Sequence, residues 1–336
     1  MKVLLYTEGL KTIGKSGLGK AIKHQMTALE NEHIEYTLDP KDDDYDILHI
    51  NTYFPKSYRI AKKAKKKGKK IVYHAHSTEE DYKNGFIFAK QTSKLFKKWL
   101  IKCYSLGDVI VTPTLYSKNL LQGYKGLENK KIYDISNGIE IDFFKKDKKL
   151  GEKFRKDYGF TKDDKIVMGI GLYIERKGIV DFVELAKRLP EYKFIWFGYS
   201  PLAAATKPVR KAVNTKLDNL FFPGYVERDV IKGAMSGSDL YIFPTFEETE
   251  GIPIIEACAC KQNAIVRDIP IFDGWLEDGK NVYKAKDVDE FEKKIKMFFD
   301  GELPSVVDEA YKVAVERDLK TVGKKLKQVY TDVMKM

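Results

Sequence analysis

Two carboxylates separated by seven residues stand in the most informative stretch of the chain. Glu248 and Glu256 belong to Phe243-Pro-Thr-Phe-Glu-Glu-Thr-Glu-Gly-Ile-Pro-Ile-Ile-Glu-Ala257, where we expect a strand to end at Phe243 and a helix to begin near Pro253. The free backbone N–H groups of such a helix start suit a phosphate, and carboxylates beside it can accept hydrogen bonds from sugar hydroxyls. The spacing is also compatible with an ordinary helix start that carries acidic residues.

Two histidines lie at the end of another expected strand. His74 and His76 are two residues apart, so we expect their side chains to point to the same side. Such a pair could bind a metal ion, but no carboxylate or cysteine at a close spacing completes a ligand set. We therefore expect no metal site, and a histidine that is only structural is the alternative interpretation.

A glycine-rich segment, Gly14-Lys-Ser-Gly-Leu-Gly19, precedes an expected helix. It lacks the final glycine of the dinucleotide-binding fingerprint and the spacing of a Walker loop. Gly17 and Gly19 therefore either approach a ligand or form a plain turn. The acidic run at 42–44 precedes a strand instead of following one, which favours a solvated turn over a metal-binding pair.

The positive charge of the chain is concentrated in its first half. The net charge is +11, and residues 1–150 hold 29 Lys and Arg against 18 Asp and Glu, so the rest of the chain is neutral. Most of the 60 basic residues are lysines, which are hydrated point charges, whereas arginines make the bidentate contacts that read base edges. This balance argues against a nucleic-acid partner and favours an anionic membrane surface.

Two basic segments, 56–70 and 85–104, could meet such a surface because neither contains an acidic residue. The second segment has apolar residues on one broad helical face and lysines elsewhere, as in helices that lie in a lipid headgroup layer. The alternative is that this face packs on the sheet and the lysines are only solvated. The candidate acceptor- or membrane-facing residues are Trp99, Phe96, Lys94, Lys98 and Lys66.

Strand-like and helix-like segments alternate along the chain. This alternation predicts an α/β fold of doubly wound, Rossmann-like domains with parallel sheets and helices on both faces. Ligands of such domains bind at the carboxyl ends of the strands, so we expect function in the loops that follow strands. The expected strands are 2–6, 46–50, 70–74, 108–112, 131–135, 165–171, 193–197, 219–222, 239–243 and 263–266.

The length of 336 residues suits two domains, at roughly 150 residues each. We expect a first domain over 1–148, a second over 149–315 and a C-terminal helix over 316–336 that packs back on the first, with the charged stretch 144–156 as the linker. No apolar run approaches the roughly 18 residues of a membrane-spanning helix, and the first residues do not resemble a signal peptide. Three cysteines without metal-ligand spacing favour a reducing cytoplasm.

Five motifs, in order over residues 2 to about 285, resemble the retaining glycosyltransferases of family 4, which have the GT-B fold with two domains facing a cleft. Glu248-Thr-Glu-Gly-Ile-Pro-Ile-Ile-Glu256 resembles their Glu–seven residues–Glu signature. The other four resemble the diphosphate-binding loop, the segment that packs on the nucleoside, the segment before the interdomain linker and the loop that carries a functional His. They are Ile170-Gly-Leu-Tyr-Ile-Glu-Arg-Lys-Gly-Ile179, Phe222-Pro-Gly-Tyr-Val226, Ser136-Asn-Gly-Ile-Glu140 and Val72-Tyr-His-Ala-His-Ser-Thr78.

The resemblance implies roles for individual residues. Glu248 would face the donor sugar and Glu256 the nucleotide ribose, while His76 would donate a hydrogen bond to the donor sugar or orient it. The catalytic candidates are Glu248, His76 and Lys177. The donor-binding candidates are Arg176, Gly171, Glu256, Gly251, Ile252, Pro253, Tyr225 and Gly17.

The diphosphate-binding loop departs from the family pattern at one position. The family usually has an Arg directly after the Gly of this loop, but Leu172 follows Gly171 here. Lys177 matches the family's Lys, and Arg176 is a candidate for the missing cation. Cations are needed because the leaving nucleoside diphosphate gains negative charge in the transition state.

The resemblance further implies a hexosyltransferase that uses a UDP-sugar, glucose or galactose, retains the anomeric configuration by front-side attack, and needs no metal or other cofactor. The N-terminal Lys-Val-Leu-Leu-Tyr-Thr-Glu-Gly run and the basic helices look like those of bacterial enzymes that build glycosyl-diacylglycerols. We therefore expect monoglucosyl-diacylglycerol as the acceptor and an α-linked diglycosyl-diacylglycerol, a lipoteichoic acid anchor, as the product. The enzyme would lie peripherally on the inner face of the cell membrane. A capsular or other saccharide acceptor and a non-catalytic polyanion-binding protein are the alternatives.

Overall fold

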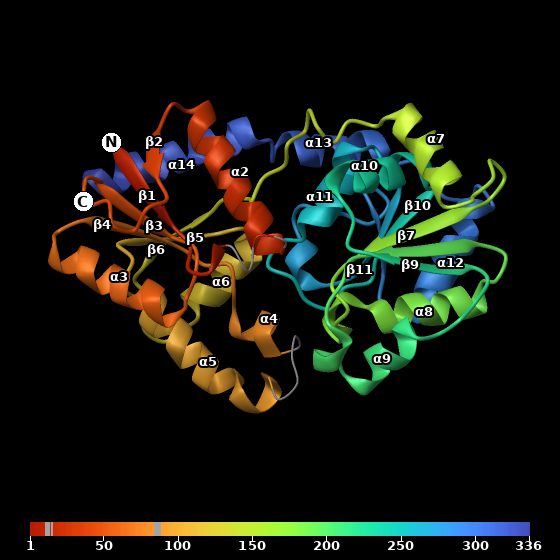
Figure 1. Cartoon of the computed structure of the whole chain (residues 1–336), viewed down its shortest axis with the longest axis horizontal. Coiled ribbons are helices and arrows are strands. Elements are labelled where there is room, and N and C mark those ends of the chain that lie inside the picture. Colours follow the sequence, from red (N-terminus) through yellow and green to blue (C-terminus); the bar gives the residue numbers. More distant parts are fainter. Residues whose placement is uncertain (11–13, 15, 84–88) are drawn as a thin grey trace. The chain divides into compact units, whose positions relative to one another are not determined.

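The computed structural model describes residues 1–10, 14, 16–83 and 89–336, which contain two six-stranded sheets (Figure 1). The strand orders are β2-β1-β3-β4-β5-β6 and β12-β11-β10-β7-β8-β9, and neighbouring strands pair in parallel. The expected α/β fold class is confirmed. Of the described residues, one compact unit takes in 1–82, 91–140 and 317–336, and a second takes in 83, 89, 90 and 141–316.

Alternate residues of the strands in the first unit pack into two different cores. In β4, Ile71 and Tyr73 face a core shared with α3 and α5, whereas Val72 faces a core shared with α2 and α14. This alternation is what a sheet covered by helices on both faces requires. The strands of this unit are β1 Lys2–Tyr6, β2 Glu35–Thr37, β3 Ile47–Ile50, β4 Lys70–His74, β5 Val109–Thr112 and β6 Lys131–Asp134. Its helices are α2 Gly17–Asn31, α3 Pro55–Lys66, α4 Glu79–Lys83, α5 Ala89–Tyr104, α6 Leu115–Gln122 and α14 Leu319–Met334.

The second unit has a core rich in aromatic side chains, in which Phe182 of α8 packs edge-to-face on Trp196 of β8. Its strands are β7 Ile166–Ile170, β8 Lys193–Phe197, β9 Leu220–Gly224, β10 Leu240–Phe243, β11 Ala264–Arg267 and β12 Tyr283–Ala285. Its helices are α7 Lys148–Asp157, α8 Ile179–Arg188, α9 Lys207–Val213, α10 Arg228–Gly237, α11 Ile252–Ala259, α12 Val288–Phe299 and α13 Val307–Val315. The short 3₁₀ helices are η1 Glu175–Lys177, η2 Leu202–Ala204 and η3 Pro270–Phe272.

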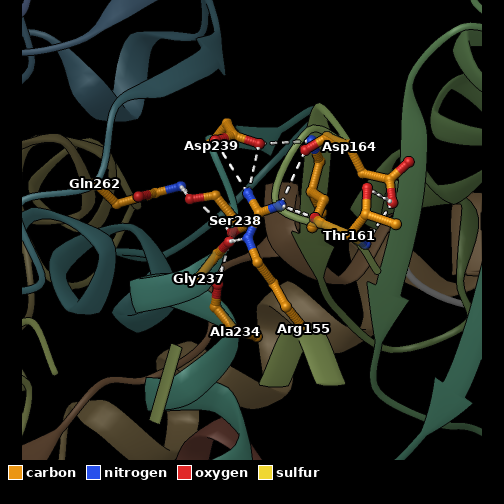
Figure 2. Close-up of polar contacts among 9 residues, drawn as sticks. Arg155, Thr161, Asp164, Ala234, Gly237, Ser238, Asp239 and Gln262 are labelled. Carbon is orange, nitrogen blue, oxygen red and sulfur yellow. Dashed lines mark hydrogen bonds and ion pairs between the residues drawn. The ribbon is translucent and has the colours of Figure 1, made fainter. Parts of the chain in front are cut away.

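Most of the charged stretch that we interpreted as a linker is the helix α7, which belongs to the second unit. The first unit reaches Glu140, before the boundary expected at residue 148. Figure 2 shows how Arg155 of α7 is fixed: its guanidinium donates to the carbonyl oxygens of Gly237, Thr161 and Asp164 and pairs with the Asp239 carboxylate at 3.0 Å. This charged helix therefore packs as part of the second unit, because the half-buried guanidinium of Arg155 donates to several acceptors at once.

The C-terminal segment forms two helices with a break at Glu316–Asp318. The second of these, α14, belongs to the first unit, and Val322, Leu326 and Tyr330 lie in the same core as β1 and α2 (Figure 1). The expected return of the C-terminal helix is confirmed. Among the described residues, no helix is both long and apolar enough to cross a membrane.

Candidate active site

The loops that follow the adjacent strands β7 and β10 are joined by close backbone contacts. Gly178 has a φ of +76°, and a Cβ atom there would overlap the carbonyl oxygen of Pro244, so only glycine allows this approach. The carbonyl oxygen of Arg176 accepts from Phe246 N at 2.8 Å and from Thr245 Oγ1 at 3.0 Å. The two loops therefore form one structure at the carboxyl edge of the second sheet.

Glu248 lies inside this structure between two cations. Its carboxylate pairs with Lys177 Nζ, and Arg176 Nη1 lies 3.6 Å from Oε2 while also donating to Glu247 O at 2.6 Å. Glu248 is 7% exposed, and burial by itself raises the pKa of its carboxyl. The positive charges of Lys177 and Arg176 outweigh burial, so the pKa of Glu248 lies below its usual value. The site thus holds an ionised carboxylate beside two cations.

The diphosphate-loop candidate Gly171 is packed tightly from two sides. Its carbonyl oxygen accepts from Trp196 Nε1 at 2.9 Å, and a Cβ atom on Gly171 would lie 2.9 Å from the Trp196 ring. Gly198 packs so close to Gly171 that a side chain there would overlap its carbonyl oxygen. Leu172, which stands where the family has Arg, is 41% exposed. The Trp196 side chain and the close approach of Gly198 therefore shape the start of this loop.

The second carboxylate of the motif lies in the first turns of α11. Gly251 caps this helix with a φ of +93°, and Ile252 and Pro253 form its first turn. Glu256 is 1% exposed. Burial raises the pKa of the nearby Tyr241 hydroxyl, and the negative charges of Glu256 and Glu248 raise it further. The Tyr241 hydroxyl has no hydrogen-bond partner among the described protein groups. The helix start and these polar groups together fit an anionic ligand with hydroxyls.

Arg267, which the sequence analysis did not single out, supports the β10–α11 loop from β11. Its Nε donates to Pro244 O at 3.0 Å, its guanidinium carbon lies 3.9 Å from the Phe246 ring centroid, and it pairs with the Asp181 carboxylate. Thr245, whose hydroxyl lies 3.1 Å from Glu248 Oε1, was also missed. Both are polar residues at strand ends, which is the signal that could have found them.

The chain resembles known glycosyltransferases over its whole length. The family description "Glycosyl transferases group 1" matches residues 151–314, and "Glycosyltransferase Family 4" matches residues 33–143. The "Processive diacylglycerol alpha-glucosyltransferase" of Acholeplasma laidlawii is 39% identical over 336 residues, covering 100% of this chain and 99% of the relative. The chain belongs to the family 4 glycosyltransferases.

Other relatives and solved structures agree with the assignment of this chain to the glycosyltransferases. The "Alpha-galactosylglucosyldiacylglycerol synthase" of Streptococcus pneumoniae is 24% identical, covering 94% of this chain and 79% of the relative. Anabaena HepE in complex with UDP-glucose superimposes with a TM-score of 0.79 at 18% identity, covering 99% and 100% of the two chains. Sucrose-phosphate synthase from Thermosynechococcus elongatus gives 0.72 at 15% identity, covering 86% and 74%. These neighbours show that the fold of the glycosyltransferase is GT-B.

Within the second unit, the structure brings together the donor-site candidates from two motifs. Glu248, Arg176 and Lys177 are in contact, whereas Tyr225 follows β9 and is 48% exposed. Arg176 adjoins Lys177 in the short helix η1, so the two cations of this loop lie side by side. The assignment of these residues to the donor remains a prediction.

His76 and Gly17 belong to the first unit of the glycosyltransferase. His76 stacks on His74 with ring centroids 4.1 Å apart, as expected for residues on the same side of a strand end. Gly17 starts α2, whose N-cap Ser16 accepts from Gly19 N at 3.2 Å, and a Cβ on Gly17 would meet no atom within 4 Å. Lys15 lies outside the described residues. Where the chain is described, no group of three or more His, Cys, Asp or Glu residues could hold a metal ion.

The apolar face expected for the second basic segment is largely packed inward. Phe96 and Trp99 of α5 pack on the core of the first unit, and Trp99 Nε1 donates to Tyr53 O at 2.7 Å. Leu95 is the exception at 68% exposure, and Lys94 and Lys98 beside it are exposed, as is Lys66 of α3. Phe88 lies outside the described residues. Leu95 and the lysines beside it are therefore the exposed part of this expected face.

Proposed function

We propose that this glycosyltransferase transfers a hexose from a UDP-sugar to a diacylglycerol-based lipid and forms an α-glycosidic bond. The full-length likeness to the diacylglycerol glucosyltransferase carries the proposal, because 39% identity extends over both units. That relative favours glucose as the donor sugar. We propose monoglucosyl-diacylglycerol as an acceptor, and the word "processive" in the relative's name makes diacylglycerol itself the other acceptor to test.

The chemistry proposed for the donor site uses the charges in the second unit. The leaving UDP gains negative charge, which Arg176, Lys177 and the N-terminus of α11 would stabilise without a metal ion. Glu248 would hold the sugar hydroxyls, and Glu256 the ribose. The anomeric configuration would be retained by front-side attack, with the departing phosphate accepting the proton of the acceptor hydroxyl.

The acceptor is a lipid, so the proposal includes a peripheral position on the inner face of the cell membrane. The positive charge of residues 1–150 and the exposed group Lys94, Leu95 and Lys98 support it. Lysines near an anionic surface contribute about 1 kcal/mol each, so a few are enough for reversible binding.

The experiment that tests the function offers the protein both donors and both lipids. Vesicles with diacylglycerol or monoglucosyl-diacylglycerol are incubated with UDP-glucose or UDP-galactose, with and without EDTA, and the lipids are analysed by mass spectrometry and NMR. We expect an α-linked hexosyl lipid from UDP-glucose, unaffected by EDTA. Glu248→Gln should abolish the product, whereas Glu184→Gln on the surface of α8 should not.

Three results would contradict the proposal. If neither donor gave a lipid product, the proposal of a lipid acceptor would be wrong. Transfer to a soluble saccharide alone would favour the alternative of a capsular or other saccharide acceptor. A β-linked product would contradict retention, because the donor sugar in UDP-glucose is α-linked.

A further inference from the structure

Six polar side chains form a buried network in the first unit, and they come from two helices and from two strands with the residues that follow them. His49 lies in β3 and Asn51 follows it, His74 lies in β4 and His76 follows it, and the other two come from helices α2 and α14. All but His76 are at most 2% exposed. The six residues of this network, named here the histidine network, are Gln25, His49, Asn51, His74, His76 and Tyr330.

The hydrogen bonds at Asn51 determine where His76 carries its proton. The Asn51 Oδ1 atom is an acceptor, and it lies 2.9 Å from Gln25 Nε2 and 2.9 Å from His76 Nε2. Both nitrogens must therefore donate, so His76 carries its proton on Nε2. In a neutral ring the other nitrogen, Nδ1, then has a free lone pair and can only accept.

The same reasoning runs through the rest of the network to the C-terminal helix. Gln25 Nε2 can only donate and lies 2.9 Å from His74 Nδ1, so this nitrogen of His74 is an acceptor. His49 Nε2, 3.1 Å from the same atom, must then donate, which leaves His49 Nδ1 to accept from the Tyr330 hydroxyl at 2.5 Å. His74 Nε2 has no partner among the described protein groups, so the contacts at Nδ1 alone set its tautomer.

The rings in this network are kept uncharged by their surroundings. Burial lowers the pKa of His49 and His76 to about 3 and lowers that of His74 well below its usual value. His76 and His74 are stacked with an interplanar angle of 2°, and His74 and His49 with one of 10°, so a second positive charge would face the first directly. One arrangement of protons therefore extends from Tyr330 to His76 at neutral pH.

We propose that Asn51 is a positioning residue that holds His76 with its proton on Nε2, so that His76 accepts a hydrogen bond from a substrate hydroxyl through Nδ1 instead of donating one. Tyr330 holds His49 in the matching arrangement within the same network. The contact with a substrate rests on the proposed function, whereas the proton arrangement does not. The C-terminal helix α14 thereby contributes to the histidine network through Tyr330, which is 281 residues from His49 in the sequence.

The test is the tautomeric state of the histidines, read by long-range ¹H–¹⁵N NMR of the full chain with ¹⁵N-labelled histidine. The chain has only 5 histidines, so each can be assigned from a His→Gln variant. We expect a protonated Nε2 and an unprotonated Nδ1 for His76 in the wild-type protein. Asn51→Ala should give a mixture of both tautomers at His76, and Tyr330→Phe should change the signals of His49 and His74.

Tyr133→Phe is the matched control, because the Tyr133 hydroxyl donates to Asp332 of the same helix at 2.7 Å without touching a histidine. It should leave all five histidine signals unchanged. Asn51→Asp keeps the acceptor oxygen and should keep the proton on Nε2, and it replaces Asn51→Ala if that variant does not fold. A wild-type His76 with its proton on Nδ1, as an inverted Asn51 amide would give, overturns the proposal, as does an unchanged His76 spectrum in Asn51→Ala.

A kinetic measurement then tests the contact with a substrate. An even mixture of His76 tautomers in Asn51→Ala should lower kcat/KM about twofold, because only about half of the enzyme then offers Nδ1 as an acceptor, with Tyr133→Phe unchanged. If no transfer occurs in the wild-type protein, the proposed function fails while the NMR result still decides the proton arrangement. If transfer occurs and Asn51→Ala is as active as the wild type, the positioning role is wrong.

Discussion

At the scale of single residues, the donor-site candidates form an ion cluster before any donor is bound. Glu248 is paired with Lys177 and lies 3.6 Å from Arg176 Nη1, and all three side chains are 15% exposed or less. A buried carboxylate needs such partners, because desolvation of an unpaired charge is costly. A diphosphate that binds here would bring its own negative charges to the same two cations.

Arg176 is predicted to replace the cation that is missing at Leu172. Arg176→Gln should lower kcat about 100-fold, because a fixed cation that stabilises a developing negative charge is worth about that much. The double variant Leu172→Arg/Arg176→Gln should recover a large part of the loss, since position 172 is exposed enough to hold an arginine. Steady-state kinetics with UDP-glucose and the lipid acceptor measure both effects.

The control for this prediction is Arg188→Gln at the end of α8, whose guanidinium pairs with surface carboxylates of Glu184 and Asp289. It removes an arginine from the same unit and should change kcat little. An Arg176→Gln enzyme with wild-type kcat would show that Lys177 and the helix N-terminus are sufficient.

At the scale of elements, the helix α5 divides its residues between the core and the surface. Leu100, Cys103 and the half-buried Trp99 face the core, so the basic face is left with one large apolar side chain, Leu95. The exposed apolar surface of α5 is therefore smaller than the broad apolar face that the sequence predicted. Charge, with Leu95 as a single anchor, is therefore expected to dominate membrane binding.

The lysines of α5 are predicted to carry a measurable share of vesicle binding. Lys94→Gln/Lys98→Gln should weaken binding to anionic vesicles about thirtyfold, at about 1 kcal/mol for each lysine. Vesicle flotation at low and high salt measures the loss, which should shrink at high salt because exposed charges are screened. Lys324→Gln/Lys325→Gln on α14 removes the same charge from the same unit and is the control. Equal loss in both variants would show that only total charge matters.

At the scale of the whole molecule, the histidine network makes the stability of the first unit depend on pH. The pKa of His49 and His76 is about 3 in the folded chain and 6.5 in the reference state. Between these values the unfolded chain binds more protons than the folded chain, so the free energy of unfolding falls as the pH is lowered through 6.5. Each of these histidines contributes about 1.4 kcal/mol per pH unit in that range.

We predict that the first unit loses stability between pH 6 and 5 more steeply than the second, at roughly 1.4 kcal/mol per pH unit for each buried histidine. Urea titrations read by peptide-resolved hydrogen exchange separate the two units. His33→Asn, at an exposed position with a φ of 54°, should leave the slope unchanged, whereas His49→Gln should reduce it. A first unit whose urea midpoint does not move between pH 7 and 5 would contradict the prediction.

Much of the secondary structure follows from local patterns in the sequence. The apolar runs at 2–6, 70–74 and 193–197 are strands with those same bounds. The strands β2 and β12 were missed because each has three residues at a sheet edge, too few to show a periodic pattern. The helix α7 was missed because its apolar content is low and its position depends on Arg155 and on contacts of Gly151 with the end of α10.

The sequence by itself determined the fold class and the family, and it predicted the catalytic candidates Glu248, Lys177 and His76, because these depend on periodicity and on motifs that are local in the chain. Only the tertiary structure decided which side chains meet: Arg176 with Glu248, Arg267 with Pro244, and Tyr330 with His49. It also decided that Trp99 faces the core and Leu95 the surface. The physical reason is that burial and hydrogen-bond partners come from distant segments, as with Tyr330 and His49, which are 281 residues apart, and no local pattern records them.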